Sequence, residues 1–261
     1  MKNPLRVIDG MMKPGEPFWR FNDQVKNEAE PIELYFEGPI SEYTWWGDEV
    51  TPESFRNELF TKGGGRPVTM YVNSPGGEVI AASVIRSILQ EYPGKITADI
   101  VGLAASAATI VVTGADVIRM RESALFMIHD PSGIAMGTVD EMRAFIDVLK
   151  TVKDSIVDAY ETKTKLDRDR LSKMMSDESW LTAREAKELG FVDEVVTGSK
   201  RKATNSLVPV GFANCLASYS NVPEALKSLL STPVETVTAQ NEPSAEERRL
   251  RDEVKLIQGA K

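Results

Sequence analysis

Residues 67–101, PVTMYVNSPGGEVIAASVIRSILQEYPGKITADIV, decide the fold class of this chain. Pro67–Asn73 and Ile96–Val101 are short runs rich in apolar and β-branched residues, which are typical of buried strands. Between them, apolar residues recur at helical spacing from Glu78 to Glu91, and Pro93-Gly94 ends the pattern. A strand, a helix and a second strand in this order predict an α/β fold with largely parallel pairing.

The alternation of strands and helices extends beyond this unit in both directions. Before it, Ile32–Phe36 predicts a strand, and Thr51-Pro52-Glu53 has the N-cap, the first-turn proline and the early acid of a helix start. After it, we expect a short helix over 106–114, strands over 117–120 and 124–128, helices over 166–175 and 182–189, and a strand over 191–196.

From Thr138 the hydrophobic period becomes that of one long helix. Apolar residues recur every three or four positions, at Met142, Phe145, Leu149, Val152, Ile156 and Tyr160. This stripe predicts an amphipathic helix over about residues 138–164. Such a stripe can pack on its own domain or against another chain.

The composition divides the chain into three parts. Residues 1–30 are polar and punctuated by proline, and we expect a loose N-terminal arm. Residues 31–200 carry the strand and helix patterns and form the expected domain. Residues 201–261 are expected to be a partly flexible C-terminal extension, in which residues 231–244 (STPVETVTAQNEPS) are typical of a linker.

Composition and charge argue against several functional classes. The sequence has 31 Lys and Arg against 39 Asp and Glu, a net charge of −8, so we expect no nucleic-acid partner. Cys215 is the single cysteine, which permits no intrachain disulfide and fits a reducing compartment. No run approaches the roughly 18 apolar residues of a membrane span, and the first residues lack the apolar core of a secretion leader. We therefore expect a cytoplasmic protein without a membrane anchor.

The sequence NSPGG at residues 73–77 lies between a predicted strand and a predicted helix. Gly76 and Gly77 allow backbone conformations that other residues avoid, and they let a ligand approach the chain closely. Their amides, beside the start of a helix, could bind a negatively charged group. Because glycines also mark many turns that bind nothing, the segment taken alone favours a plain turn.

Ser106 lies in the small-residue run GLAASAA, residues 102–108, which also follows a strand and opens a helix. A hydroxyl at a strand–helix turn can act as a nucleophile, and the amide of Ala107 could donate to a developing oxyanion. The run differs from the usual G-x-S-x-G pattern. Small residues of this kind also occur where helices pack closely, and that alternative is the commoner one.

His129, the single histidine, ends an apolar strand in the sequence MIHDP. Its imidazole could take the proton of a serine, although a hydrogen-bonded structural histidine is the simpler interpretation of the position. A metal site built from several histidines is excluded, whereas a carboxylate site for Mg²⁺ or Ca²⁺ is not. An acid would have to orient the histidine, and Asp177 and Glu178 are candidates, unless both are surface charges.

Together these segments resemble the proteolytic subunit of the Clp protease (ClpP). The resemblance runs from about Ile32 to Val196 and includes, in order, the NSPGG turn, the GLAAS segment, the MIHDP segment and the stretch ESWLTAREAKELGFVDEVV. Four segments in the right order are far more specific than any one of them. The resemblance implies a crotonase-like α/β spiral of ββα units with a protruding handle helix, to which the helix over 138–164 would correspond.

The resemblance also implies roles for individual residues. Ser106 corresponds to the nucleophile of the family and His129 to its general base. The backbone amides of Gly77 and Ala107 correspond to its oxyanion hole, with Gly76 nearby. No metal or other cofactor is implied.

The third member of the triad is where this sequence departs from the family. Counted back from Trp180, Glu178 falls on the position of the family's aspartate. The longer side chain could still reach the imidazole, and Asp177 remains the alternative.

A narrower resemblance is to the phage and prophage branch of the family, the ClpP-like head maturation proteases. It rests on Glu42–Pro52 (EYTWWGDEVTP), the form GLAASAAT, the form ESW and the long C-terminal extension. It implies a serine endopeptidase acting on capsid or scaffold proteins in the host cytoplasm. The family further implies a homo-oligomeric ring, a heptamer or a tetradecamer, and in its general branch a Clp-type ATPase partner.

Two other functions share features with this interpretation. A crotonase-like acyl-CoA enzyme would share the fold and the oxyanion hole, but generally relies on a carboxylate rather than on a serine and a histidine. A catalytically inactive capsid-assembly scaffold would keep the fold alone. A membrane-bound Ser–Lys peptidase fits less well, since no anchor is visible and a histidine is present.

Overall fold

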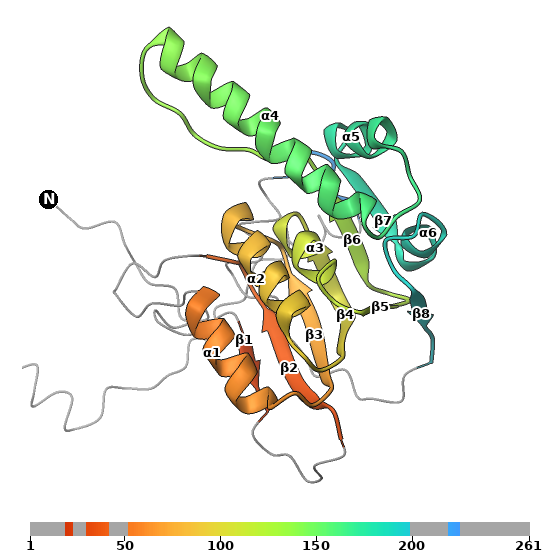
Figure 1. The fold of residues 1–261 in the computed structure, drawn as a ribbon. Helices are drawn as coiled ribbons and strands as arrows, with labels where there is room; N and C mark the ends of the chain where they lie inside the picture. The colour runs from red at the N-terminus through yellow and green to blue at the C-terminus, as the bar shows by residue number, and fades with distance from the viewer. Residues whose placement is uncertain (1–18, 23–29, 42–51, 199–218, 225–261) are drawn as a thin grey trace, which may run out of the picture.

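A mixed sheet with helices packed on it forms the body of the molecule (Figure 1). The computed structural model describes residues 19–22, 30–41, 52–198 and 219–224. The elements are β1 (Trp19–Phe21), β2 (Ile32–Glu37), α1 (Pro52–Gly63), β3 (Val68–Ser74), α2 (Val79–Glu91), β4 (Ile96–Ala105), α3 (Ala107–Val112), β5 (Val117–Arg121), β6 (Leu125–Ile128), α4 (Val139–Glu161), α5 (Arg168–Ser176), β7 (Ser179–Thr182), α6 (Ala183–Glu188) and β8 (Glu194–Val196).

The strands run in the order β1-β2-β3-β4-β5-β8, and all neighbours except β1 and β2 are parallel. This agrees with the predicted α/β class and its largely parallel pairing. Strand β4 is longer than expected because it continues through the small residues up to Ala105. It changes partner along its length: Thr97–Ile100 pairs with β5, whereas Leu103–Ala105 pairs with β6. Strand β6 then pairs antiparallel with β7.

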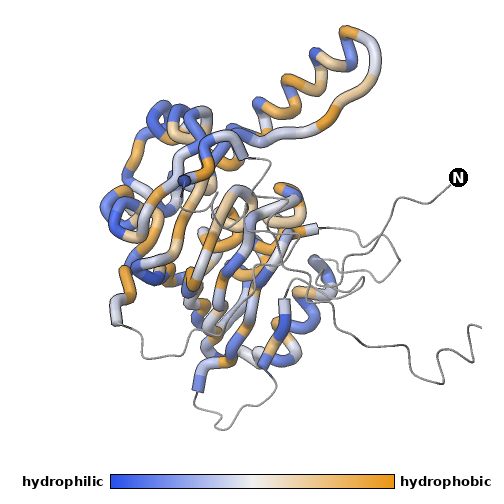
Figure 2. Tube along the Cα trace, turned by 180° about the vertical axis from the view of Figure 1, so that it is seen from behind, coloured by the Kyte–Doolittle hydropathy of each residue, from blue (hydrophilic) through white to orange (hydrophobic). Residues whose placement is uncertain are grey.

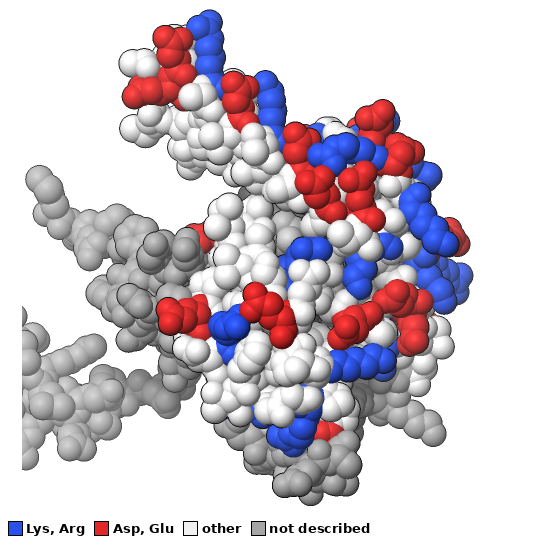
Figure 3. All heavy atoms as spheres, viewed as in Figure 1, with Lys and Arg blue, Asp and Glu red and all other residues white. Residues whose placement is uncertain are grey.

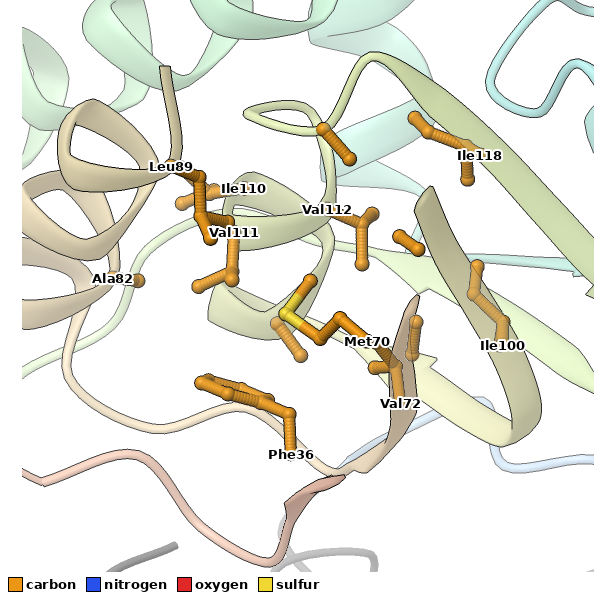
Figure 4. Close-up of a cluster of buried hydrophobic side chains, with 14 of the residues drawn as sticks. Phe36, Met70, Val72, Ala82, Leu89, Ile100, Ile110, Val111, Val112 and Ile118 are labelled. Carbon is orange, nitrogen blue, oxygen red and sulfur yellow. The ribbon is translucent and has the colours of Figure 1, made fainter. Parts of the chain in front are cut away.

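The core lies between the sheet and helices α2 and α3. Every second residue of β2 and β3 is buried, as the period of two in a strand requires. Figure 4 shows side chains from strands and helices meeting in one apolar cluster. Its labelled members are Phe36, Met70, Val72, Ala82, Leu89, Ile100, Ile110, Val111, Val112 and Ile118.

Helix α4 is the predicted long helix, and its two ends have different surroundings. It begins with a capping box, in which Thr138 and Glu141 satisfy each other's backbone amides. Its C-terminal part is buried through Ile156, Val157 and Tyr160. Its N-terminal part extends away from the body of the molecule (Figure 1), as a handle helix would.

Tyr160 links this helix to the backbone of Ser106. The hydroxyl of Thr109 donates to the carbonyl oxygen of Ser106 at 2.5 Å, and the Tyr160 hydroxyl lies 2.6 Å from Thr109 Oγ1. Because the single proton of Thr109 is already used, Tyr160 is the donor of the second bond. The base of the handle therefore supports the start of α3.

Residues near the start of the described chain pack on the body of the molecule. Trp19 packs edge-on against Phe55, with ring centroids 5.3 Å apart, and its indole donates to Glu58 at 2.6 Å. Residues 19–21 are therefore a strand and not part of a loose arm. Strand β7 was not predicted. The rest of the expected arm, the linker over 231–244 and the remainder of the extension lie outside the described residues.

Replacing Tyr160 with Phe removes one buried hydrogen bond and leaves the ring in place. We expect the free energy of unfolding to fall by about 1 kcal/mol, the usual net value of such a bond. Urea denaturation followed by circular dichroism measures it. An unchanged midpoint would mean that the link between α4 and Thr109 contributes nothing to stability.

Candidate active site

Three of the sequence motifs meet at one edge of the sheet, because they follow three neighbouring parallel strands. The NSPGG turn follows β3, Ser106 follows β4 and His129 follows β6. Ala104 of β4 pairs with both Ser74 of β3 and Phe126 of β6, so the carboxyl ends of the three strands coincide. In sheets of this class, ligands bind outside that edge.

The side chains of Ser106 and His129 are in contact. Ser106 Oγ lies 2.7 Å from His129 Nε2, a hydrogen-bonding distance. Ser106 has φ 54° and ψ −127°, which non-glycine residues rarely adopt. Its amide donates to the carbonyl of Met127 at 2.9 Å, which holds this strained residue against β6. Strain of this kind is frequent at functional sites, where the surrounding structure maintains it.

The environment of His129 favours the neutral imidazole. Burial lowers the pKa of His129, and the charges of Glu178 and Asp130 oppose that effect without reversing it. A neutral imidazole has one unprotonated nitrogen, and Nε2 can then accept the proton of the Ser106 hydroxyl. The pair has the geometry and the protonation state that a nucleophile and its general base require.

The two glycines of the NSPGG turn lie where a side chain would collide. Gly76 has φ 94°, and a Cβ there would lie 2.6 Å from the carbonyl oxygen of Ala105 and 2.7 Å from Cβ of Ser106. Gly77 has φ 146°, and a Cβ there would collide with the backbone of Ile40. Both positions therefore need glycine, for conformation and for space.

Two backbone amides near Ser106 have no backbone acceptor in the part of the chain that the structure describes. Ala107 is the first residue of α3, and an amide in the first helical turn has no acceptor within its helix. In the described part of the chain, neither the Ala107 amide nor the Gly77 amide donates to another backbone group. Gly76 packs directly against Ser106 and Ala107, since a Cβ on it would lie 2.7 Å from Cβ of Ser106 and 2.9 Å from the amide nitrogen of Ala107.

The two candidate acids have different partners. Asp177 ends α5, and its carboxylate pairs with Lys173 Nζ at 2.6 Å. Glu178 lies just before β7, the antiparallel neighbour of β6, and its charge acts on His129. Glu178 has φ 49°, the second non-glycine residue with positive φ among the described residues.

The carboxylate of Glu178 accepts three hydrogen bonds. Its donors are Trp180 Nε1 at 3.2 Å, the amide of Ser220 at 2.8 Å and the amide of Asn221 at 2.6 Å. As far as the chain is described, no hydrogen bond joins Glu178 directly to His129. Sequence reasoning missed residues 219–221, because backbone donors leave no signature in the sequence.

Neither a metal site nor a membrane span is found in the ranges that the structure describes. No group of three or more His, Cys, Asp and Glu side chains is placed to hold an ion there. None of the described helices is both long and apolar enough to cross a bilayer.

Comparison with known proteins identifies the family. The family model described as Clp protease matches residues 58–199, more than half of the chain. The chain belongs to the Clp protease family. The predicted enzyme class, a serine-type endopeptidase, is thereby confirmed.

Two relatives and one solved structure show how far the similarity to this family extends. The ATP-dependent Clp protease proteolytic subunit 2 of Thermobifida fusca is 34% identical over 138 residues, which are 51% of this chain and 67% of that protein. Subunit 1 of Chlamydia pneumoniae is 28% identical over 68% of this chain and 93% of its own length. The structure of a ClpP1 point mutant from Listeria monocytogenes aligns with a TM-score of 0.55 and 21% identity, covering 63% of this chain and 90% of the other. It confirms the predicted fold class.

Replacing Gly76 with Ala tests the packing of the turn against the serine. The new Cβ would displace Ser106 or the amide of Ala107, so we expect a fluorophosphonate probe to react with Ser106 at least about 100-fold more slowly, the size of effect that follows loss of an oxyanion donor in serine enzymes. Gly64→Ala is the matched control. Gly64 also has positive φ, 56°, but a Cβ there meets nothing within 4 Å. Equal reaction rates in the two variants would contradict the argument.

Proposed function

We propose that this chain hydrolyses peptide bonds by acyl transfer, with Ser106 as nucleophile and His129 as general base. The observation that carries the proposal is the 2.7 Å contact between Ser106 Oγ and His129 Nε2, beside amides without backbone acceptors. Glu178 is proposed as the third member of the triad, since its charge acts on His129 whereas Asp177 pairs with Lys173.

The proposed reaction has two halves. Ser106 Oγ attacks the carbonyl carbon of the substrate while its proton passes to His129 Nε2, and the oxyanion is held by the amides of Gly77 and Ala107. The tetrahedral intermediate collapses as His129 protonates the leaving amine, which departs. Water, deprotonated by His129, then attacks the acyl-enzyme, and the acid product leaves as the proton returns to Ser106.

For the substrate, we propose capsid or scaffold proteins, as in a head maturation protease of a phage or prophage that acts in the host cytoplasm. The sequence features of that branch support this choice: residues 42–52, the form GLAASAAT, the form ESW and the long C-terminal extension. The second candidate is a general protein-degradation subunit that works with a Clp ATPase. The names of the curated relatives, ATP-dependent Clp protease proteolytic subunits, favour that alternative.

We also propose that the chain assembles into a homo-oligomeric ring, a heptamer or two stacked heptamers, through α4. Large apolar side chains are exposed on the protruding part of this helix and on the loop before it: Ile134, Met136, Val139, Met142, Ile146 and Val148. Figure 2 shows hydrophobic residues recurring along this part, and Figure 3 shows charged side chains gathered on the other side of the helix. An apolar face of this kind marks a protein interface.

Ser106→Ala should lower peptide hydrolysis by a factor of about 10³ or more without changing the circular dichroism spectrum, because the nucleophile is lost and the core is untouched. The fluorophosphonate probe should label the wild type at Ser106 alone, as mass spectrometry would show. Ser87→Ala, an exposed serine on α2, is the control and should keep full activity. Unchanged turnover in Ser106→Ala would refute the proposed function.

Co-expression separates the two substrate classes. The wild type and Ser106→Ala are each produced with candidate capsid and scaffold proteins, with or without a Clp ATPase, and the products are analysed by mass spectrometry. A few defined cuts in capsid or scaffold protein, with no ATPase present, support head maturation. Extensive degradation that requires the ATPase supports the general function.

Ile146→Lys tests the assembly surface on α4. Burying a lysine at an apolar interface is costly, so we expect a shift toward smaller species in light scattering at micromolar concentration. Asp147→Lys, on the charged side of the same helix, should leave the assembly intact. A wild type that is already a monomer would refute the ring.

A further inference from the structure

Tyr219, in the C-terminal extension, packs against the imidazole of His129. Its ring meets that of His129 edge to face, with centroids 5.1 Å apart, and meets the indole of Trp180 in the same way at 5.9 Å. Its hydroxyl donates to the carbonyl of Pro75, in the NSPGG turn. One side chain thus contacts the ends of β3 and β6 and the strand β7.

The next two residues contact the candidate acid. The amides of Ser220 and Asn221 donate to the two carboxylate oxygens of Glu178, at 2.8 and 2.6 Å. The side-chain amide of Asn221 donates to the carbonyl of Asp177 at 2.9 Å, and Val222 is buried. Hydrogen bonds therefore hold Ser220 and Asn221 against Glu178 and Asp177, and the next residue, Val222, is buried in the same region of the chain.

We infer that residues 219–221 position the triad: Tyr219 fixes the ring of His129, and the amides of Ser220 and Asn221 hold the carboxylate of Glu178. This inference rests on the proposed function. It makes a short segment of the C-terminal extension part of the active site, although it lies more than 20 residues beyond the last strand of the sheet.

The departure from the family's aspartate gives a physical reason for this arrangement. Glutamate has one more rotatable bond than aspartate, and ordering it costs conformational entropy. Two backbone amides and the Trp180 indole fix the carboxylate in one orientation. A carboxylate has about four acceptor positions, so one remains for the imidazole N–H that Ser106 does not use.

The partners of residues 219–221 favour a role in positioning the triad over a role in blocking the substrate site. The hydrogen bonds and ring contacts of residues 219–221 go to Pro75, His129, Trp180 and the two acids. All of these partners belong to the turn after β3, to the base, to β7 or to the candidate acids. The segment thus contacts the acid and the base, while Ser106 itself remains half-buried rather than fully enclosed.

Two variants of Ser220 isolate the backbone amide. Ser220→Pro removes the donor to Glu178, whereas Ser220→Ala keeps it and removes only the hydroxyl. We expect the fluorophosphonate to react with Ser106 at least about 10-fold more slowly in the proline variant than in the alanine variant, part of the loss that follows removal of an orienting acid. Equal rates in two variants with native circular dichroism would overturn the inference.

Two variants of Tyr219 provide a second test, in which the measured quantity is the acid limb of the pH–rate profile. A residue that only stabilised the fold would not shift this limb. The charged groups that act on His129 are Glu178 and Asp130, and Asp130 pairs with Lys153 at 2.8 Å. Both variants keep these charges, but Tyr219→Ala exposes the imidazole to water and Tyr219→Phe keeps it covered. Since burial lowers the pKa of His129, the acid limb of the pH–rate profile should move to higher pH in the alanine variant than in the phenylalanine variant.

The same experiments separate this inference from the proposed function. A wild type that the probe does not label at Ser106 would refute the proposed function. A labelled wild type, with identical acid limbs in the two Tyr219 variants, would overturn the positioning role alone. If Ser220→Pro does not fold, the comparison of Tyr219→Ala with Tyr219→Phe tests the positioning role by itself.

Discussion

The site depends on one feature of the sheet, the change of partner along β4. Its first half pairs with β5 and its last three residues pair with β6. Because β4 and β6 are neighbours at their carboxyl ends, the residues that follow them lie close together, and Ser106 contacts His129. The hydrogen bond from the Ser106 amide to Met127 fixes this junction and maintains the positive φ of the serine. If β4 paired with β5 along its whole length, β6 would not lie beside the end of β4, and Ser106 and His129 would not be brought into contact.

Elements distant in sequence support this junction from several sides. The NSPGG turn packs against it through Gly76, and the base of α4 reaches it through Tyr160 and Thr109. Glu178, just before β7, acts on His129 through its charge, and the ring of Tyr219 packs edge to face against the imidazole. Burial lowers the pKa of His129 and so favours the neutral imidazole, and the charge of Glu178 can stabilise the positive charge that the ring would acquire when it takes a proton.

The sequence predicted the elements and the motifs better than their contacts. Periodicity and turn residues located the long helix and the parallel strands to within a few residues. The pairing of β4 with both β5 and β6 is a non-local choice that no short pattern encodes. Trp19–Phe21 was expected to be a loose arm, because a three-residue strand is too short to show alternation. Its burial depends on Phe55 and Glu58, more than 30 residues away.

The sequence could predict those parts of the candidate site that are formed by side chains. Ser106, His129 and Glu178 can be recognised as residue types in an ordered set of segments. The contacts of residues 219–221 could not be recognised, because two of them are made by backbone amides, which every residue except proline possesses. The aromatic ring of Tyr219 has no distinguishing context in a weakly apolar stretch.

The central claim is that Ser106 donates to the Nε2 atom of a neutral His129. Because His129 is the single histidine in the sequence, ¹⁵N NMR of a histidine-labelled sample reports on it without assignment. The account predicts a neutral ring protonated on Nδ1, with a pKa below the ordinary value of about 6.5, and a change in the Nε2 signal in Ser106→Ala. A ring protonated on Nε2, with an ordinary pKa and no response to that substitution, would contradict it.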